Sequence, residues 1–311
     1  MTASFISTLT IGLYNAIMWI LVTLFAAACQ SMRTAHQKTL SQKQGFLHAT
    51  MARSLFGLPL VSLYLMLCWW LFGGVQMPSA SEFFIYASVC SVMQILATYL
   101  MLRVFQSGSF ALGTLLAKTE AVLAAVIGIP LLHYSLDVTA WLGITLGVFG
   151  ALIMSVKFNN IRHAHRDMSL LAGLGSGLCF AITSVTASKA SHALEGSVIT
   201  SAGVALWYVL ATQSILLCSI QIYRTRNVLA PITQSFGLSC KVGVLSSLGS
   251  IGWFTGFALV NPALVKTLGQ IEILGTLYYS KKKFKEKVTP QQWVGGTMIL
   301  ISVILVTIAA V

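Results

Sequence analysis

"YYSKKKFKEKVTPQQW" (Tyr278–Trp293) is the stretch that decides the fold, because it places dense positive charge between two apolar segments. Five of the chain's 19 Lys and Arg residues lie within it. About 150 residues earlier, "LLHYSLDVTAW" (Leu131–Trp141) occupies a similar setting and contains neither Lys nor Arg. The contrast suggests that the two segments are related copies that face different surroundings.

An internal duplication supports this interpretation. Shifting the sequence over itself by 152 residues aligns identical residues without gaps. The matches are Phe105 with Phe257, Ala111 with Ala263, Leu112 with Leu264, Leu116 with Leu268, Glu120 with Glu272, Trp141 with Trp293, Gly143 with Gly295 and Thr145 with Thr297. The Glu and Trp matches are the most informative, since these residues are rare in apolar sequence.

The composition is that of a membrane protein. Only 8% of the residues are charged and 57% are hydrophobic, whereas soluble domains carry about 25% charged residues. Apolar runs of about 20 residues, long enough to span a membrane as helices, recur along the chain. Ten are predicted, at 8–29, 53–74, 83–104, 109–132, 139–156, 169–191, 197–221, 236–259, 262–280 and 292–310. We therefore expect an all-α polytopic membrane protein with ten transmembrane helices.

Each copy of the duplication then contains five helices, an odd number, so the second copy must enter the membrane upside down relative to the first. We predict two inverted five-helix repeats, at residues 1–156 and 169–311, joined by a cytoplasmic linker at 157–168. The two related loops would lie on opposite sides of the membrane. The lysine cluster would hold the second copy in its inverted orientation.

The loops indicate an orientation, since Lys and Arg concentrate in short cytoplasmic loops. Sixteen of the 19 basic residues follow the odd-numbered spans, including Arg33, Lys38, Lys43 and Arg53 in a loop expected after the first span. The alternate loops carry acidic residues instead. This pattern places both termini outside. The basic residues of these loops also account for the net charge of +12, so no nucleic-acid partner is expected.

Five ionisable residues lie inside predicted spans: Lys118, Glu120, Lys189, Lys266 and Glu272. Such charges cost about 2.5–3.5 kcal/mol on insertion scales and are functional candidates by default. Lys189 lies near the end of its span, so we expect its side chain to reach the interface.

Lys118 and Lys266 are candidates for substrate binding. Thr114 and Lys118 are four residues apart, as are Lys266 and Gln270, so each pair would share a helix face. A midplane cavity lined by two ammonium groups suits an anionic or zwitterionic substrate, such as a carboxylate. The alternative is a set of Lys–Glu bridges, such as one from Lys118 to Glu272, that only join helices.

Glu120 and Glu272 lie two residues beyond these stripes, about 200° around the helix, and are expected to face away from the lysines. They are candidates for carrying a coupling proton or for pairing helices. Trp253 and Tyr99 are further candidates for lining the substrate site, although aromatic side chains also pack between helices.

Three segments carry a family resemblance. "KTEAVLAAVIGIPLL" (Lys118–Leu132) is similar to the fourth-helix signature of the drug/metabolite transporter superfamily, in its EamA-like ten-helix branch. "FALVNPALVKTLGQIEIL" (Phe257–Leu274) resembles the passage from its eighth to its ninth helix, and "KEKVTPQQWVGGTMILISVILV" (Lys285–Val306) the loop and helix that close each half. The first-half loop departs from the pattern, because it has Asp137 but no acidic-basic pair.

The repeats and the resemblance together favour a secondary transporter of small polar metabolites, such as amino acids or organic acids, and an exporter in particular. The substrate would bind at the midplane between the repeats. The alternatives are an accessory subunit of a lipid-carrier flippase, a pore, or a membrane-embedded lipid enzyme. We expect no enzymatic activity, cofactor or metal, and a bacterial inner-membrane protein whose two fused repeats could form a complete unit as a monomer in the lipid bilayer.

Overall fold

The computed structural model describes residues 2–72, 78–107, 119–155, 168–225, 233–282 and 289–309. These residues are almost entirely helical and contain no strand. Six of the helical stretches are long and apolar enough to cross a membrane, and two further apolar helices are shorter. The expectation of an all-helical membrane protein is therefore confirmed at this level.

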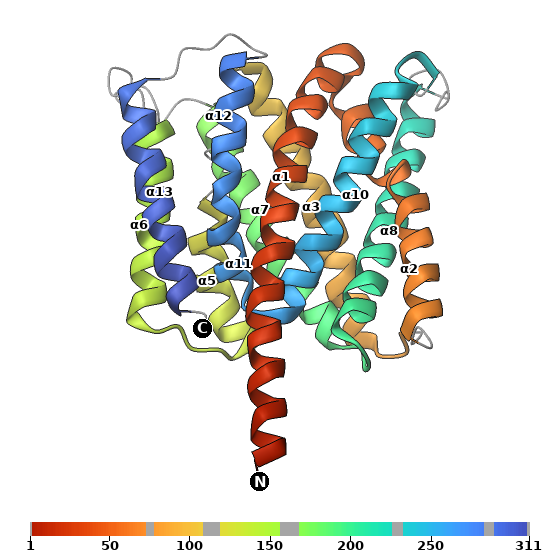
Figure 1. Ribbon diagram of the computed structural model, residues 1–311. Helices are drawn as coiled ribbons and strands as arrows, with labels where there is room; N and C mark the ends of the chain where they lie inside the picture. The colour runs from red at the N-terminus through yellow and green to blue at the C-terminus, as the bar shows by residue number, and fades with distance from the viewer. Residues whose placement is uncertain are drawn as a thin grey trace.

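The helices form one bundle (Figure 1). The first half contains α1 (Thr2–Leu55), α2 (Leu58–Phe72), α3 (Ser81–Ser107), α5 (Glu120–Leu132) and α6 (Val138–Ser155). The second half contains α7 (Met168–His192), α8 (Val198–Thr225), α10 (Phe236–Leu259), α11 (Pro262–Leu268), the 3₁₀ turn η3 (Gly269–Ile271), α12 (Glu272–Lys282) and α13 (Pro290–Ala309).

The first helix, α1, differs from the sequence-based expectation. Its 54 residues would span about 80 Å if straight, but the helix kinks at Gly45, where φ is 84° and ψ is 170°. Only glycine adopts this backbone conformation readily. The predicted loop after the first span is thus wrong, because helix continues through it and buries Arg33, Lys38 and Arg53 inside the bundle. Hydrogen-bonding partners on other helices make this burial possible for Arg53, which donates to Ser246 of α10 and Thr98 of α3.

The helix boundaries reproduce the internal duplication. α5 and α12 begin at residues 120 and 272, and α6 and α13 begin at residues 138 and 290, in both cases 152 residues apart. The principal packing partners also match across the halves, since α1 packs on α10, α3 on α7, and α6 on α13. With α7 taken as the counterpart of the first part of α1, and α10 as that of α3, exchanging counterparts converts the α1–α10 pair into the α3–α7 pair and leaves the α6–α13 pair unchanged.

Charge distinguishes the two ends of the bundle. Both chain termini lie at one end (Figure 1), where the exposed acids Glu82, Asp137 and Glu195 also lie, and we call this the acidic end. At the opposite end, the basic end, α8 and α12 terminate with the exposed residues Arg224, Lys281 and Lys282. This separation agrees with the alternation of charge along the sequence.

Candidate functional site

A break in the helix after α10 creates the centre of the site. Asn261 begins α11 by accepting a hydrogen bond from the amide of Ala263 at 2.8 Å, and the helix tightens into η3 at Gly269. A Cβ at Gly269 would lie 2.1 Å from the ring of Trp253, so only glycine permits this contact. α12 then starts at Glu272, which lies ten residues and about 15 Å along the helix from Pro262. That distance is about half of a ~30 Å hydrocarbon core.

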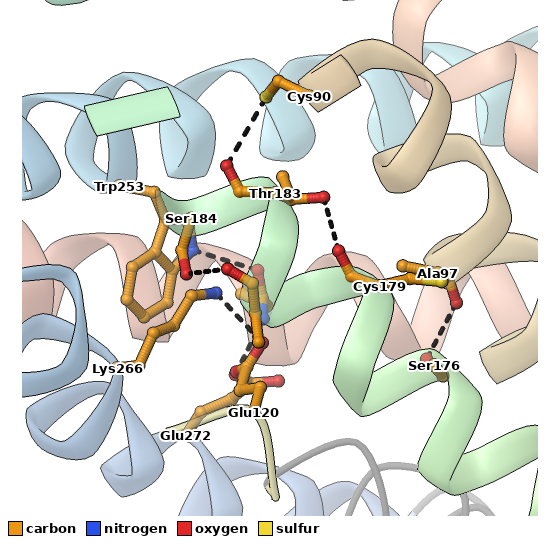
Figure 2. A network of polar contacts seen from close by, with 12 residues as sticks. Cys90, Ala97, Glu120, Ser176, Cys179, Thr183, Ser184, Trp253, Lys266 and Glu272 are labelled. Atoms are coloured by element: carbon orange, nitrogen blue, oxygen red, sulfur yellow. Dashed lines mark hydrogen bonds and ion pairs between the residues drawn. The ribbon is translucent and has the colours of Figure 1, made fainter. Parts of the chain in front are cut away.

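A buried ion pair joins the two halves of the chain beside this break (Figure 2). The Lys266 ammonium lies 3.2 Å from Oε2 of Glu120, and the two side chains are only 7% and 5% exposed. Lys266 comes from α11, whereas Glu120 is the first residue of α5. A carboxylate in the first turn of a helix also benefits from the partial positive charge of the helix N-terminus.

Three aromatic rings surround the same ammonium group. The Lys266 nitrogen lies 4.5 Å from the ring centroid of Trp253, 5.3 Å from that of Phe257 and 5.7 Å from that of Phe180. Each ring face attracts a cation, with a contribution of about 0.5–2 kcal/mol depending on desolvation. Lys266 is therefore held by one carboxylate and by rings from α7 and α10.

A glutamine on α1 connects this group to the second carboxylate. Gln30 donates from Nε2 to Glu272 Oε2 at 3.0 Å and accepts a hydrogen bond from Trp253 Nε1, also at 3.0 Å. Three helices, α1, α10 and α12, thus meet through one side chain. The sequence analysis did not select Gln30, because it lies just past the predicted end of the first span.

Arg33, one turn further along α1, is the second residue that the sequence analysis missed as part of the site. Its side chain is buried, and the carboxylates of Glu272 and Glu120 both attract it electrostatically. We refer to these residues together as the midplane cluster: Gln30, Arg33, Glu120, Trp253, Lys266 and Glu272.

Glu120 does not face away from Lys266, in contrast to the expectation for isolated helices. Glu120 pairs with Lys266 directly. The expectation treated each helix in isolation, whereas Glu120 meets a lysine from the other half of the chain. Glu272 is also buried and is bonded to Gln30.

Gln270 has different neighbours from Lys266, although the two were expected on one helix face. A Cβ added at Gly147 of α6 would lie 2.7 Å from Gln270 Oε1 and 2.5 Å from Ser302 Oγ of α13. Among the residues that the structure describes, neither amide atom of Gln270 has a hydrogen-bond partner. The 3₁₀ turn η3 lies between residues 266 and 270, and the expectation that they share a helix face stays a prediction.

The other candidates lie elsewhere. Tyr99 is 37% exposed and contacts Phe46 edge to face, with ring centroids 5.7 Å apart. Lys189 lies at the acidic end, 3.9 Å from Glu82, with a side chain that is 25% exposed, as expected for an interfacial lysine. Lys118 and Thr114 lie outside the described residues.

Comparison with known proteins identifies one family and one fold. The sequence model that describes the EamA-like transporter family matches residues 17–156 and 167–308 of this chain. A crystal structure of another protein is similar over 96% of this chain and 97% of that one, with a TM-score of 0.68 and 12% sequence identity, which relates the folds alone. No curated protein shows significant sequence similarity. The ion pair described above joins the two matched stretches, since Glu120 lies in the first and Lys266 in the second.

Proposed function

Because this chain belongs to the EamA-like transporter family of the drug/metabolite transporter superfamily, whose members are transporters rather than enzymes, we propose that it is a secondary transporter of small polar metabolites. The proposed cargo class is amino acids or organic acids, and the proposed direction is export across a bacterial inner membrane. The substrate would bind at the midplane cluster. Access would alternate between the two ends of the bundle.

We further propose ten membrane crossings arranged as two inverted repeats. The stretch from 17 to 71 is too long for one crossing, and its kink at Gly45 allows it to cross twice. Counterpart helices run in opposite directions, since α6 leaves the acidic end whereas α13 arrives there at the C-terminus (Figure 1). The reciprocal packing of α1 on α10 and of α3 on α7 also supports a two-fold relation within the membrane plane.

The observation that carries the proposal is the buried Lys266–Glu120 pair. Alternating access requires the two repeats to change their mutual packing around a fixed site. This pair joins the two halves of the chain beside a helix break, and we assign it to the midplane. Buried charges are costly to retain in a membrane unless they serve a function, and a charge pair that can open gives the substrate a place to bind.

Protonation of a carboxylate provides the proposed coupling step. A proton on Glu120 would remove the negative charge that holds Lys266 and would loosen the contact between the halves. Release of the proton would restore the ion pair. Glu272, bonded to Gln30 at the same depth, is the second candidate for this role.

Counterflow in proteoliposomes tests the function. Vesicles loaded with unlabelled amino acids or organic acids would receive trace labelled substrate outside, and a secondary transporter would accumulate the label transiently and saturably. Lys266→Ala and Glu120→Gln should abolish this exchange. Lys189→Ala, which removes a partly exposed lysine at the acidic end, serves as the matched control and should retain it.

The outcomes separate the candidate classes. Solute flux that does not saturate and shows no counterflow would indicate a pore. Folded protein without flux of any compound would favour an accessory subunit. Saturable exchange that survives in both cluster variants would keep the transporter but move its site away from the midplane cluster.

A further inference from the structure

Arg33 is buried, and none of the described residues forms an ion pair with it. The residue is only 4% exposed, although it was expected in a solvated loop. Among the described residues, no side chain or backbone group forms a hydrogen bond or ion pair with it, and its Nε atom is fully buried. A guanidinium offers five N–H donors. A buried, unsatisfied charge of this kind is strongly unfavourable unless a ligand completes it.

The carboxylates near Arg33 are engaged elsewhere. Glu120 forms its ion pair with Lys266, and Glu272 accepts a hydrogen bond from Gln30. Both attract Arg33 only from a longer range. Arg53, in the last turn of α1, repels Arg33 electrostatically.

The charge balance of the interior points the same way. The buried charged residues that the structure describes are four cations and two carboxylates: Arg33, Lys38, Arg53, Lys266, Glu120 and Glu272. The sequence holds only seven acidic residues in total, and three of them lie exposed at the acidic end. The described interior therefore holds more buried cations than buried carboxylates, and this excess favours an incoming anion.

We propose that Arg33 binds an oxyanion of the transported substrate, and that this substrate is a small organic acid with net negative charge. The inference rests on the proposed transport function and narrows its substrate class. Arg33 lies twelve residues, or about 18 Å, before the kink at Gly45, and its side chain is enclosed by other helices. The planar guanidinium pairs with carboxylate or phosphate oxygens through two parallel hydrogen bonds.

The ligand-free protein then carries an unpaired charge that the bound protein does not. Arg33→Gln should therefore raise the melting temperature of the ligand-free protein in detergent, because it removes that charge. It should also weaken anion binding about 10- to 100-fold, the range expected for hydrogen bonds to a charged group. Arg33→Lys keeps the charge but loses the paired geometry, so it should give an intermediate affinity. A residue with only a structural role would lose stability on substitution.

The experiment measures binding and transport separately. Melting temperatures of the purified full-length chain would be recorded against succinate, 3-phosphoglycerate, leucine and tyramine, and counterflow of the same compounds would be measured in vesicles. Arg224→Gln, which removes an exposed arginine from the basic end, is the matched control. Stabilisation by succinate or 3-phosphoglycerate that is lost in Arg33→Gln and kept in Arg224→Gln would support the proposal. The more effective of the two anions identifies carboxylate or phosphate.

The failures are distinguishable. Exchange of leucine or tyramine alone would overturn the anion inference and leave the transporter intact. Anion binding through Arg33 without any counterflow would sustain the inference and overturn the transport function. Anion effects that are equal in wild type and Arg33→Gln, or absent from both assays, would refute the assignment of Arg33.

Discussion

Breaking the Lys266–Glu120 pair should destabilise the protein by an amount that depends on which partner is removed. At an effective dielectric constant of about 20, unit charges 3.2 Å apart attract each other by about 5 kcal/mol before desolvation is counted. Removing one partner of a buried pair typically costs about 3–5 kcal/mol, because the other charge stays buried and uncompensated. Removing both charges together should lower the free energy of unfolding by much less.

The surroundings make the two single substitutions unequal. After Lys266→Met, Glu120 still faces the electrostatic attraction of Arg33, and the methionine thioether can pack among the three rings. After Glu120→Gln, Lys266 shares a positive interior with Arg33. We expect Glu120→Gln to lower the free energy of unfolding by about 3–5 kcal/mol, and Lys266→Met to lower it by less. The double variant should lie within about 1 kcal/mol of wild type, because a buried pair and an uncharged replacement are often similar in stability.

Unfolding by SDS in mixed micelles provides the assay, with the four proteins forming a double-mutant cycle. Lys189→Met and Glu82→Gln supply the control cycle, since that pair is 3.9 Å apart with side chains 25% and 56% exposed. Its coupling should not exceed about 1 kcal/mol. Additive losses in the Lys266–Glu120 cycle would refute the reasoning, as would a larger loss for Lys266→Met than for Glu120→Gln.

Three further predictions follow from individual contacts. Gly269→Ala should displace Trp253, because the ring lies 2.1 Å from the added Cβ position. The variant should melt at a lower temperature and show altered tryptophan fluorescence. Gly296→Ala, whose added Cβ would have no atom within 4 Å, should change neither property. Gln270→Met should raise the free energy of unfolding by about 1 kcal/mol, because it removes two buried polar atoms that lack partners among the described residues. A lower free energy of unfolding would show instead that these atoms bind a ligand or water. Burial raises the pKa of Tyr134, in the loop before α6, to about 12. A phenol in the unfolded chain ionises near pH 10. The contribution of Tyr134 to the free energy of unfolding should therefore be complete below about pH 10 and decline from there toward pH 12. The free energy of unfolding of Tyr134→Phe should decline less over that range.

The internal duplication was the strongest sequence signal, and the structure repeats its offset between the two halves. The 152-residue offset came from a few identical residues, yet it gives the starts of two pairs of helices, α5 with α12 and α6 with α13. This success has a simple cause. Helix starts depend on local sequence, and duplicated sequence repeats the same local preferences.

The segment after the first span shows where composition misleads. Arg33, Lys38 and Arg53 have the spacing and charge of a cytoplasmic loop, yet helix continues and buries them. Counting charges cannot distinguish a solvated guanidinium from one enclosed by other helices, since only the enclosing helices make the difference. The two members of the cluster that the sequence analysis missed, Gln30 and Arg33, both come from this part of α1.

The sequence by itself determined that this chain is a helical membrane protein built from two related halves. It also identified residues inside predicted spans as candidates for the site: Lys266, Glu120, Glu272 and Trp253. Hydropathy, periodicity and duplication are local properties, so one sequence is enough to read them. Only the tertiary structure decided which of these residues meet. Lys266 pairs with a carboxylate from the other half of the chain, whereas Gln270 lies beside Gly147 of α6. Such contacts depend on how the halves pack and on where a helix breaks, and neither is encoded in the spacing of residues along one helix.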